Sequence, residues 1–312
     1  MAQKNSKHIK KTSAKKLLYF LVIALLIIIA FYIVKDTKIS PLHREAKILF
    51  VGDMFFDRQI RSIMSKKGGD YVFSCNKDFL KNFDTVVGNL EGPITKNASV
   101  SLGSEVGSPN NYIFTFPVET AKLLKKYNIN IVSLGNNHIN NFGEAGIAST
   151  HKYLDEAGIE YFGGISGDEP LLRKTISGVH ITFIAYNQFG GQTQDKIVNL
   201  IKKEKDSGQK VIIFAHWGEE YVGATGSMKS TARRFANAGA DLIIGSHPHV
   251  ILEQEKIGNT EVYYSLGNFI FDQYWTHVVK NGMGVEVNLT QDSITTNTHA
   301  LEINSDGRTC VK

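Results

Sequence analysis

The sequence predicts an α/β protein with a substantially parallel sheet, and two features of the chain lead to this prediction. From residue 46 onward, short apolar runs rich in Val and Ile recur, and each has the length of a strand. Amphipathic stretches of helical length separate several of these runs, at 143–158, 194–208 and 229–239. Strands that alternate with helices are typical of parallel sheets whose two faces are both covered.

The individual elements follow from the same reading of the chain. The runs expected to form strands are 46–53, 84–91, 129–138, 180–188, 210–218, 240–249 and 261–269. The amphipathic stretches that close at Gly208 and Gly239 end in the residue that most often stops a helix. Residues 284–303 alternate apolar and polar side chains, which predicts antiparallel strands at the end of the chain.

The beginning of the chain predicts a membrane anchor. Residues 1–16 hold six lysines and no acid, and the uncharged run that follows would span roughly 27 Å as a helix. Tyr19 and Tyr32 lie near its two ends, where interfacial aromatic residues occur. We therefore expect a cytoplasmic basic tail (1–16), a transmembrane helix (17–34), a stalk (35–45) and an extracytoplasmic domain (46–312).

A cleaved signal peptide is the alternative for this segment. Such peptides have an apolar region of about 7–15 residues followed by a cleavage site with small residues. The apolar run here is longer, and the sequence VKDTKIS that follows it offers no such site. The uncleaved anchor is therefore favoured, with a single-pass protein in the cell membrane and its N-terminus in the cytoplasm.

Charge and cysteine content restrict the class of partner only in part. The net charge of +5 comes from the lysines at the N-terminus, so the main domain does not resemble a basic protein that coats nucleic acid. Cys75 and Cys310 are far apart in the sequence. An oxidising exterior would permit a disulfide between them, but two cysteines give no spacing pattern, and unpaired thiols remain equally compatible.

Polar residues stand where five of the predicted strands end. In an open α/β sheet the ligand crevice lies outside the carboxyl ends of the strands, so these side chains should meet at one edge. Carboxylate and carboxamide oxygens and imidazole nitrogens are all metal ligands. The residues concerned are Asp53, Asn89, Glu91, Asn136, Asn137, His138, His216, His247 and His249. Each alone could be a turn residue or a hydrogen-bonded histidine, but their clustering favours a metal site.

The stretch SHPH gives the strongest single indication of that site. Pro248 cannot continue a helix and fixes its own φ, so it makes a stiff turn between two imidazoles. In an extended or turn geometry, His247 and His249 lie two residues apart and can lean to the same side. Both imidazoles could then bind one metal ion or two adjacent ions.

Several further residues are candidates for contacts around this edge. Arg58 could pair with an anionic oxygen, although a surface arginine on the first helix is equally compatible. Glu219 or Glu220 could orient an imidazole, and a plain polar loop is the alternative there. By the same strand-end argument, the crevice should also receive Asn268, Asp272 and Gln273.

Six motifs in the sequence resemble those of a known protein family. The motifs are VGDMFFDR, VVGNLEGPIT, LGNNHINNFGEAGI, FAHWGEEY, IIGSHPHV and YYSLGNFIFDQ, spread between Lys47 and Gln273. Together they resemble the CapA-type family of capsule synthesis proteins, named for poly-γ-glutamate capsule assembly. That family is similar in fold to the calcineurin-like metallophosphatases, so the resemblance implies a metallophosphatase-like α/β sandwich.

The resemblance also implies roles for individual residues. It gives a two-metal cage made of Asp53, Glu91, Asn137, His216, His247 and His249, with Asn89 close to the bridging Glu91. His138 would contact the transition state or the leaving group. Three positions depart from the metallophosphatase pattern: Phe55 replaces a metal-binding histidine, Glu91 replaces the usual aspartate, and Asn141 replaces an aspartate that follows the NNH motif.

Two classes of function follow from these features. In the first, the protein is a hydrolase that acts on a phosphoester or amide with one or two divalent ions of Mn, Zn or Fe, with His138 and Arg58 as catalytic groups. In the second, it is a non-catalytic component that binds or exports an anionic polymer such as poly-γ-glutamate. Under either class, the resemblance implies other capsule-synthesis membrane proteins as partners and no nucleic acid.

Overall fold

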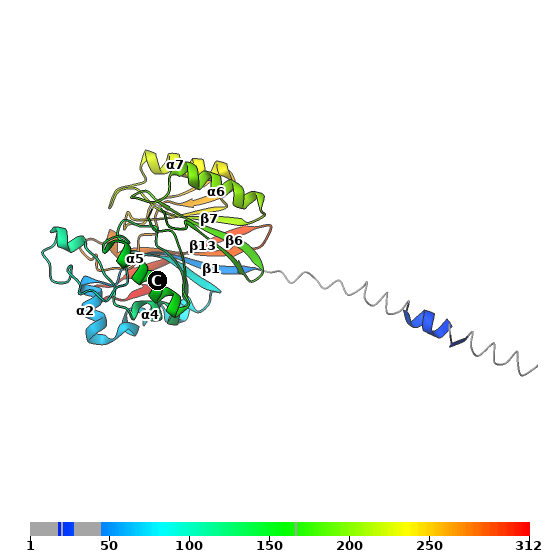
Figure 1. The fold of residues 1–312 in the computed structure, drawn as a ribbon, viewed down its shortest axis with the longest axis horizontal. Coiled ribbons are helices and arrows are strands. Elements are labelled where there is room, and N and C mark those ends of the chain that lie inside the picture. Colours follow the sequence, from blue (N-terminus) through cyan, green and yellow to red (C-terminus); the bar gives the residue numbers. More distant parts are fainter. Residues whose placement is uncertain (1–17, 20, 28–44, 166) are drawn as a thin grey trace, which may run out of the picture. The chain divides into compact units, whose positions relative to one another are not determined.

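The computed structural model describes residues 18–19, 21–27, 45–165 and 167–312. Residues 45–312 form one compact unit, and the fold described here is that of this unit (Figure 1). Its strands form two sheets, which confirms the mixed α/β class. The predicted strands are divided between these two sheets. The alternation of strands and helices predicted a substantially parallel sheet, but it did not predict this division.

The first sheet combines parallel and antiparallel strands. Its order is β14 (Thr309–Val311), β13 (Ile294–Ile303), β12 (Asn281–Leu289), β1 (Ala46–Met54), β2 (Thr85–Leu90), β3 (Ile129–Ser133) and β4 (Glu160–Phe162), and β11 (Asn268–Ile270) also pairs with β1. The first four strands of the chain run parallel, whereas β12 is antiparallel to β1 and β13 to β12. The alternating tail thus forms the antiparallel strands that its pattern predicted.

The second sheet is built from the later α/β part of the chain. Its order is β5 (Leu171–Ile176), β6 (Val179–Asn187), β7 (Lys210–His216), β8 (Leu242–Ser246), β10 (Thr260–Tyr263) and β9 (Gln254–Ile257). The four central strands run parallel, and the edge strands β5 and β9 are antiparallel to their neighbours. Strands β6, β7 and β8 are fully or largely buried, as strands of a covered parallel sheet must be.

Three apolar clusters hold the layers together. Phe50, Val87, Phe183, Phe214 and Ile244 belong to the cluster that fills the space between the two sheets. A second cluster joins the outer face of the first sheet to its helices, and a third joins the outer face of the second sheet to its own. The result is a four-layer sandwich, helices on sheet on sheet on helices (Figure 1).

The helices lie on the two outer faces. The first sheet is covered by α2 (Arg58–Lys67), α4 (Thr120–Lys126) and α5 (Gly143–Ala157), with the short α3 (Lys77–Leu80) and the 3-10 turns η1 (Gly69–Phe73) and η2 (Pro109–Tyr112) nearby. The second sheet is covered by α6 (Gln194–Asp206) and α7 (Gly226–Ala238), and η3 (Val278–Lys280) precedes β12. Thr193 and Thr225 cap α6 and α7 by accepting hydrogen bonds from backbone N–H groups of the first turn.

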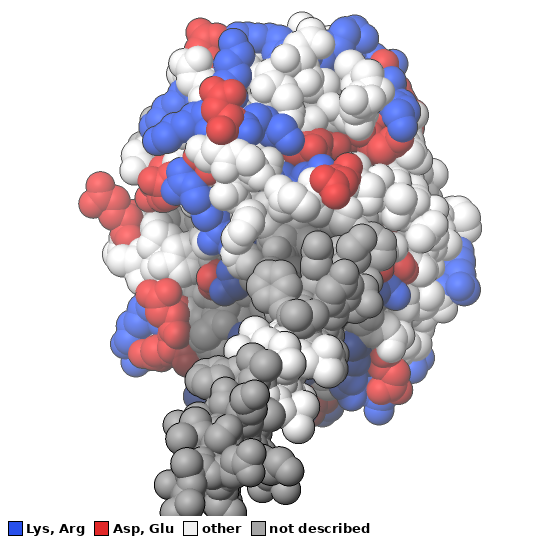
Figure 2. Space-filling view, turned by 90° about the vertical axis from the view of Figure 1, so that its right-hand side faces the viewer, with Lys and Arg blue, Asp and Glu red and all other residues white. Residues whose placement is uncertain are grey.

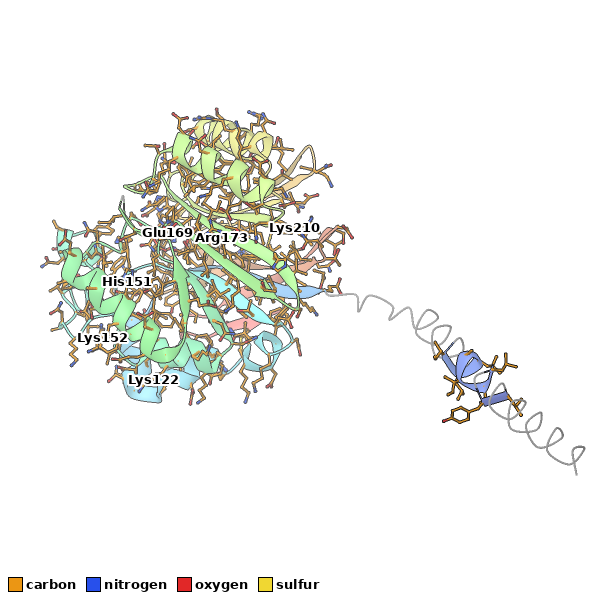
Figure 3. All side chains as sticks on the ribbon, turned by 45° about the vertical axis from the view of Figure 1, so that its right-hand side comes forward. Lys122, His151, Lys152, Glu169, Arg173 and Lys210 are labelled. Atoms are coloured by element: carbon orange, nitrogen blue, oxygen red, sulfur yellow. A yellow bond between two sulfur atoms is a disulfide. The ribbon has the colours of Figure 1, made fainter. Side chains whose placement is uncertain are left out.

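A charged pair joins helix α6 to the second sheet. Arg173 lies on the edge strand β5 (Figure 3), and its guanidinium donates to both carboxylate oxygens of Glu204 on α6, at 2.7 and 2.6 Å.

On the face drawn in Figure 2, basic and acidic side chains of the described residues are interspersed. That face therefore has no continuous field of one sign that would attract a polyion.

One glycine sets the position of the first site residue. β11 runs parallel to β1 and places Asn268 opposite Asp53. The two backbones approach so closely that a Cβ atom on Gly52 would lie 1.8 Å from the carbonyl oxygen of Gly267. Only glycine fits there, and the N–H of Asp53 donates to this same carbonyl at 3.1 Å. The close approach is thus what brings β11 against the end of β1.

The beginning of the chain requires a correction. Among the residues that the structure describes, no helix has both the length and the apolar character needed to cross a membrane. Residues 18–19 and 21–27 are helical, and the rest of 17–34 lies outside the described residues. The predicted transmembrane helix is therefore not supported, and the predicted single-pass membrane localisation, with a cytoplasmic N-terminus, is wrong by this finding. The predicted tail (1–16) and nearly all of the stalk (35–45) lie outside the described residues.

The two cysteines form a disulfide. Cys75, between η1 and α3, is bonded to Cys310 in β14, 235 positions further along the chain. The bond joins the region that follows the first helix to the last strand of the chain. It decides between the two alternatives that the sequence left open.

Removing this disulfide should destabilise the fold strongly. A cross-link that closes a loop of this length restricts the unfolded chain, and loss of a native disulfide typically costs about 2–5 kcal/mol. We expect the double variant Cys75→Ser/Cys310→Ser to lose that much free energy of unfolding in a denaturant titration. A reducing agent should lower the stability of the wild type and leave the double variant unchanged. Equal stability of the two proteins without reductant would contradict this expectation.

Candidate metal centre

The carboxyl ends of strands from both sheets meet at one place. From the first sheet come Asp53 at the end of β1, Glu91 just after β2 and Asn137 after β3. From the second sheet come His216, the last residue of β7, and the pair that follows β8. Five of the six residues predicted as metal ligands are buried, and Asn137 is half-buried. The parallel direction of these strands is what brings residues so distant in sequence together.

The turn after β8 holds both imidazoles in an unusual backbone conformation. His247 has φ 94° and His249 has φ 58°, in the left-handed region that non-glycine residues rarely occupy. Pro248 separates them and fixes the bend. The backbone N–H of His247 donates to Asp53 Oδ2 at 3.1 Å, which anchors the turn to β1. Backbone strain of this kind clusters at functional sites, where the surroundings hold it in place.

His249 lies between two carboxylates. Its Nδ1 is 3.3 Å from Asp53 Oδ2 and 3.0 Å from Asn268 Oδ1, and its Nε2 is 3.7 Å from Glu91 Oε1. Because both of these Nδ1 neighbours are acceptors, Nδ1 is the nitrogen that donates to them, and Nε2 is the nitrogen that faces Glu91. The Nδ2 of Asn268 donates to the side-chain oxygen of Gln273 at 3.0 Å, which fixes the amide in this orientation. Asn268 therefore presents His249 as a nitrogen ligand.

His216 connects the two sheets at the centre of the cluster. Its Nε2 lies 2.9 Å from Asn137 Oδ1 and 3.9 Å from Glu91 Oε1, and its Nδ1 lies 3.0 Å from Ser246 Oγ. Burial lowers the pKa of His216 well below its usual value, and burial also lowers the pKa of His247 to about 4. Both imidazoles are therefore neutral near pH 7, which is the form that binds metal ions.

A chain of carboxamides supports the ligands from behind. Asn89 Nδ2 donates to Asp53 Oδ1 at 2.8 Å, and Asn136 Nδ2 donates to Asn89 Oδ1 at 3.0 Å. Asn187 Nδ2 in turn donates to the backbone carbonyl of Asn136 at 3.0 Å. Asn89 and Asn136 thus hold other side chains of the cluster in place. The sequence reading missed Asn187 and Ser246, although both stand at strand ends and the same rule points to them.

Glu91 provides the clearest indication that a cation fits here. Its side chain is fully buried, and neither carboxylate oxygen has a hydrogen-bond partner among the described residues. Nδ1 of His247 is also buried without a partner there, and ligand atoms of Glu91, His247 and His249 lie within 4.8 Å of one another. Burial, and then the nearby Asp53, raise the pKa of Glu91 well above its usual value. A divalent cation would satisfy these atoms together, so this donor set fits a metal.

His138 lies beside the cluster. Its ring packs at 4.1 Å from that of Phe114, tilted by 34°. Its Nδ1 is 3.2 Å from Asn141 Oδ1, which also accepts the backbone N–H of Phe114 at 2.8 Å. Burial lowers the pKa of His138 to about 3. The imidazole is therefore neutral near pH 7, with its proton on Nδ1 and a lone pair on Nε2.

An aspartate in place of Asn141 should raise the pKa of His138. A carboxylate that accepts the Nδ1 proton stabilises the imidazolium, whereas an amide oxygen does so only weakly. We expect Asn141→Asp to raise this pKa substantially, measured as the pH dependence of the imidazole signals in an NMR titration of chelator-treated protein. Asn140→Asp makes the same change on an exposed neighbour and should have little effect. Identical titration curves for all three proteins would show that the pair does not couple.

Arg58 and Asp272 form an ion pair at the edge of the site. The guanidinium donates to both carboxylate oxygens, at 3.1 and 2.5 Å, and its remaining nitrogen lies 3.3 Å from Asn111 Oδ1. Phe55, where the metallophosphatase pattern has a histidine, stacks on Phe271 at 4.6 Å and lies under the guanidinium. The arginine is thus already paired, and no ligand atom occupies position 55. Glu220 lines the same edge.

The fold and this cluster define a two-sheet α/β protein with a candidate metal site at its strand ends. Residues 47–273 match the family described as "Bacterial capsule synthesis protein PGA_cap". The chain belongs to this family, as the motifs in the sequence indicated. It is 30% identical over 298 residues to the "Capsule biosynthesis protein CapA" of Bacillus anthracis, covering 86% of this chain and 72% of that protein.

Two further similarities complete the comparison. The "PGA biosynthesis protein CapA" of Bacillus subtilis (strain 168) is 28% identical over 265 residues, covering 75% of this chain and 68% of that protein. Among solved structures, the crystal structure of TT1561 of Thermus thermophilus is similar with a TM-score of 0.41 and 8% identity, over 81% of this chain and 98% of that one. The family assignment rests on the sequence matches.

Proposed function

We propose that this protein is a metal-dependent hydrolase of capsule synthesis, with a metallophosphoesterase-like site. The observation that carries the proposal is Glu91, whose two buried carboxylate oxygens have no partner among the described residues and lie close to His247 and His249. A buried carboxylate without a partner is costly unless a cation binds it. The names of the relatives, capsule and PGA biosynthesis proteins, support poly-γ-glutamate capsule synthesis as its setting.

The ligand set follows from the side chains that converge. The residues proposed to hold one or two divalent ions of Mn, Zn or Fe are Asp53, Glu91, Asn137, His216, His247 and His249. Such ions would supply Lewis-acid polarisation of a phosphoester or amide oxygen. Asn268 and Asn89 orient His249 and Asp53, so the protein side chains are held in place before substrate binds.

His138 and Arg58 are the groups proposed to act on the substrate. His138 is neutral and holds its proton on Nδ1, so its Nε2 lone pair is free to accept a proton from the substrate side. Arg58 could contact an anionic oxygen only by sharing or opening its pair with Asp272. Glu220 lines the adjoining cavity and is proposed as a substrate contact.

A non-catalytic role in binding or exporting the capsule polymer is the second candidate. The observation that favours it is the pair of substitutions relative to the metallophosphatase pattern, Phe55 and Asn141, which remove one ligand and one carboxylate. Under this candidate the cluster would hold a structural ion, and the partners would be an anionic polymer and other proteins of capsule synthesis.

Metal content and hydrolysis, measured together, test both candidates. The full-length chain, purified without chelator, should contain about one or two equivalents of metal and should hydrolyse a phosphomonoester, phosphodiester or amide substrate. His247→Ala should lose both metal and activity, while its melting temperature in chelator stays close to that of the wild type. Bound metal without hydrolysis in any assay would favour the second candidate. Absence of metal from the wild type would overturn the proposed site.

A further inference from the structure

A large cavity opens beside the candidate metal centre. Its volume is about 790 Å³, within the range of small-molecule sites. His138 and His249 line it on the side of the metal cluster, so a molecule bound there would lie next to the proposed reaction centre. Its other walls come from the start of α2, the loop 101–114 and the segment 271–275.

Aromatic side chains form much of the cavity wall, and three of them are exposed to solvent. Trp275 is 60% exposed and Tyr221 is 44% exposed, and their rings meet edge to face at 5.7 Å. Tyr112, on the opposite loop, is 49% exposed. Tyr221 also has positive φ, 61°, and its hydroxyl accepts from Gln273 at 2.9 Å, so its ring is held in place. A ligand that covered these rings would remove a considerable apolar area from water.

The charge of the cavity does not suit an anionic polymer. Apart from His138 and His249 at the border, Arg58 is the only basic side chain among its lining residues, and Asp272 binds it through two hydrogen bonds. Glu220 adds a second carboxylate, for which no ion pair is found among the described residues. The lining side chains thus carry more negative than positive charge, and in the metal-free protein they would repel a chain of carboxylates.

The remaining polar groups are neutral and suited to hydroxyl groups. Gln59 and Ser62, on α2, line the cavity, and their side chains make no hydrogen bond to other described residues. Ser104 and Asn111 add a hydroxyl and an amide from the facing loop, and these two groups already hydrogen-bond to each other at 3.1 Å. Amides, hydroxyls and an unpaired carboxylate can each donate to or accept from a hydroxyl.

We propose that this cavity binds an uncharged glycan segment, with sugar rings against Tyr221 and Trp275 and sugar hydroxyls on Gln59, Ser62 and Glu220. The faces of sugar rings present C–H groups that pack on aromatic rings, and their edges present hydroxyls that need donors and acceptors. The cavity offers both, with little positive charge. The inference rests on the proposed function in one respect, because it names what the substrate carries beside the hydrolysed bond.

Binding of small probes to the full-length chain tests the inference. The probes are two neutral trisaccharides, maltotriose and N,N′,N″-triacetylchitotriose, and an anionic γ-glutamyl trimer of comparable length. Binding is measured by calorimetry and by tryptophan fluorescence, because Trp275 is exposed in the cavity and Trp217 is buried elsewhere. In chelator-treated protein we expect at least one neutral trisaccharide to bind and the γ-glutamyl trimer to bind much more weakly.

Variants identify the binding surface. Trp275→Ala and Tyr221→Ala should each weaken trisaccharide binding about tenfold or more, as for aromatic residues at the centre of an interface. Val278→Ala removes a nearby exposed apolar side chain that does not line the cavity, and it should leave binding unchanged. The inference is overturned if neither trisaccharide binds at about 10 mM, a very weak affinity. Tighter binding of the γ-glutamyl trimer, or insensitivity to both aromatic substitutions, would also overturn it.

A chelator separates this inference from the proposed function. Trisaccharide binding should persist when metal is removed, because the aromatic rings and the neutral polar groups do not depend on a cation. Binding that persists in a protein without metal or hydrolytic activity would support the cavity and reject the hydrolase. Metal binding and hydrolysis without trisaccharide binding would do the reverse.

Discussion

Replacing Glu91 by Gln should abolish metal binding and at the same time stabilise the metal-free fold. Even changes outside the ligand set weaken metal binding about 10–100-fold, so loss of a central carboxylate should exceed that range. Without metal, the carboxylate of Glu91 is buried with no partner for either oxygen among the described residues, and a neutral amide costs less free energy to bury. Such a result would show that Glu91 destabilises the metal-free fold and that its role is to bind metal.

The pH dependence of this gain has a definite sign. The pKa of Glu91 is raised in the fold, by burial first and then by Asp53, so protonation of this group favours the folded state. Its contribution to stability is present at low pH and is lost as the pH rises through the folded pKa. The difference in melting temperature between Glu91→Gln and wild type, both in chelator, should therefore grow as the pH rises above the ordinary pKa of a glutamate.

A matched substitution serves as the control. Glu105→Gln makes the same change at an exposed position and should alter neither metal content nor the pH dependence of melting. If Glu91→Gln destabilised the metal-free protein at all pH values, the carboxylate would have a structural partner, and the argument for a cation at this position would fail.

Replacing Gly52 by Ala should damage both the fold and the site. The new Cβ would lie 1.8 Å from the backbone oxygen of Gly267, and a backbone atom cannot move aside as a flexible side chain can. Overpacking of this kind typically costs about 1–3 kcal/mol, and we expect the upper end or more because two strands must separate. Since β11 carries Asn268 opposite Asp53, metal affinity should fall together with stability.

Denaturant unfolding in chelator and metal titration measure the two effects. Gly223→Ala is the matched control, because a Cβ there meets no atom within 4 Å and its φ is not positive. That variant should be close to wild type in both measurements. Wild-type stability of Gly52→Ala would mean that β1 and β11 can separate without cost, and that their close approach does not position Asp53.

Much of the candidate site could be predicted because its signal is local. A buried strand reads as an apolar run, and the polar residue that follows it, such as Asp53 or His216, marks the carboxyl end. Parallel direction then brings those ends together. The division of the strands into two sheets has no such local signal, since it depends on which apolar faces pack against each other across the sandwich.

Contacts between distant segments also could not be predicted from the sequence. The pair between Arg58 and Asp272 joins residues that are 214 positions apart, and neither has a pattern that selects the other. The same is true of the cavity, whose walls come from loops without periodicity. The turn at His247 and His249 was predicted as stiff, but its left-handed backbone depends on the hydrogen bond to Asp53 from the other sheet.

The origin of the ligands has a consequence for the cooperativity of unfolding. Asp53 and Glu91 belong to one sheet and His216 and His249 to the other, so an ion bound to all four would be a cross-link between the two halves of the sandwich. The halves could not separate without releasing it. The free metal concentration would then determine how often the two sheets separate. The resistance of the segments between them to proteases would rise with the logarithm of that concentration.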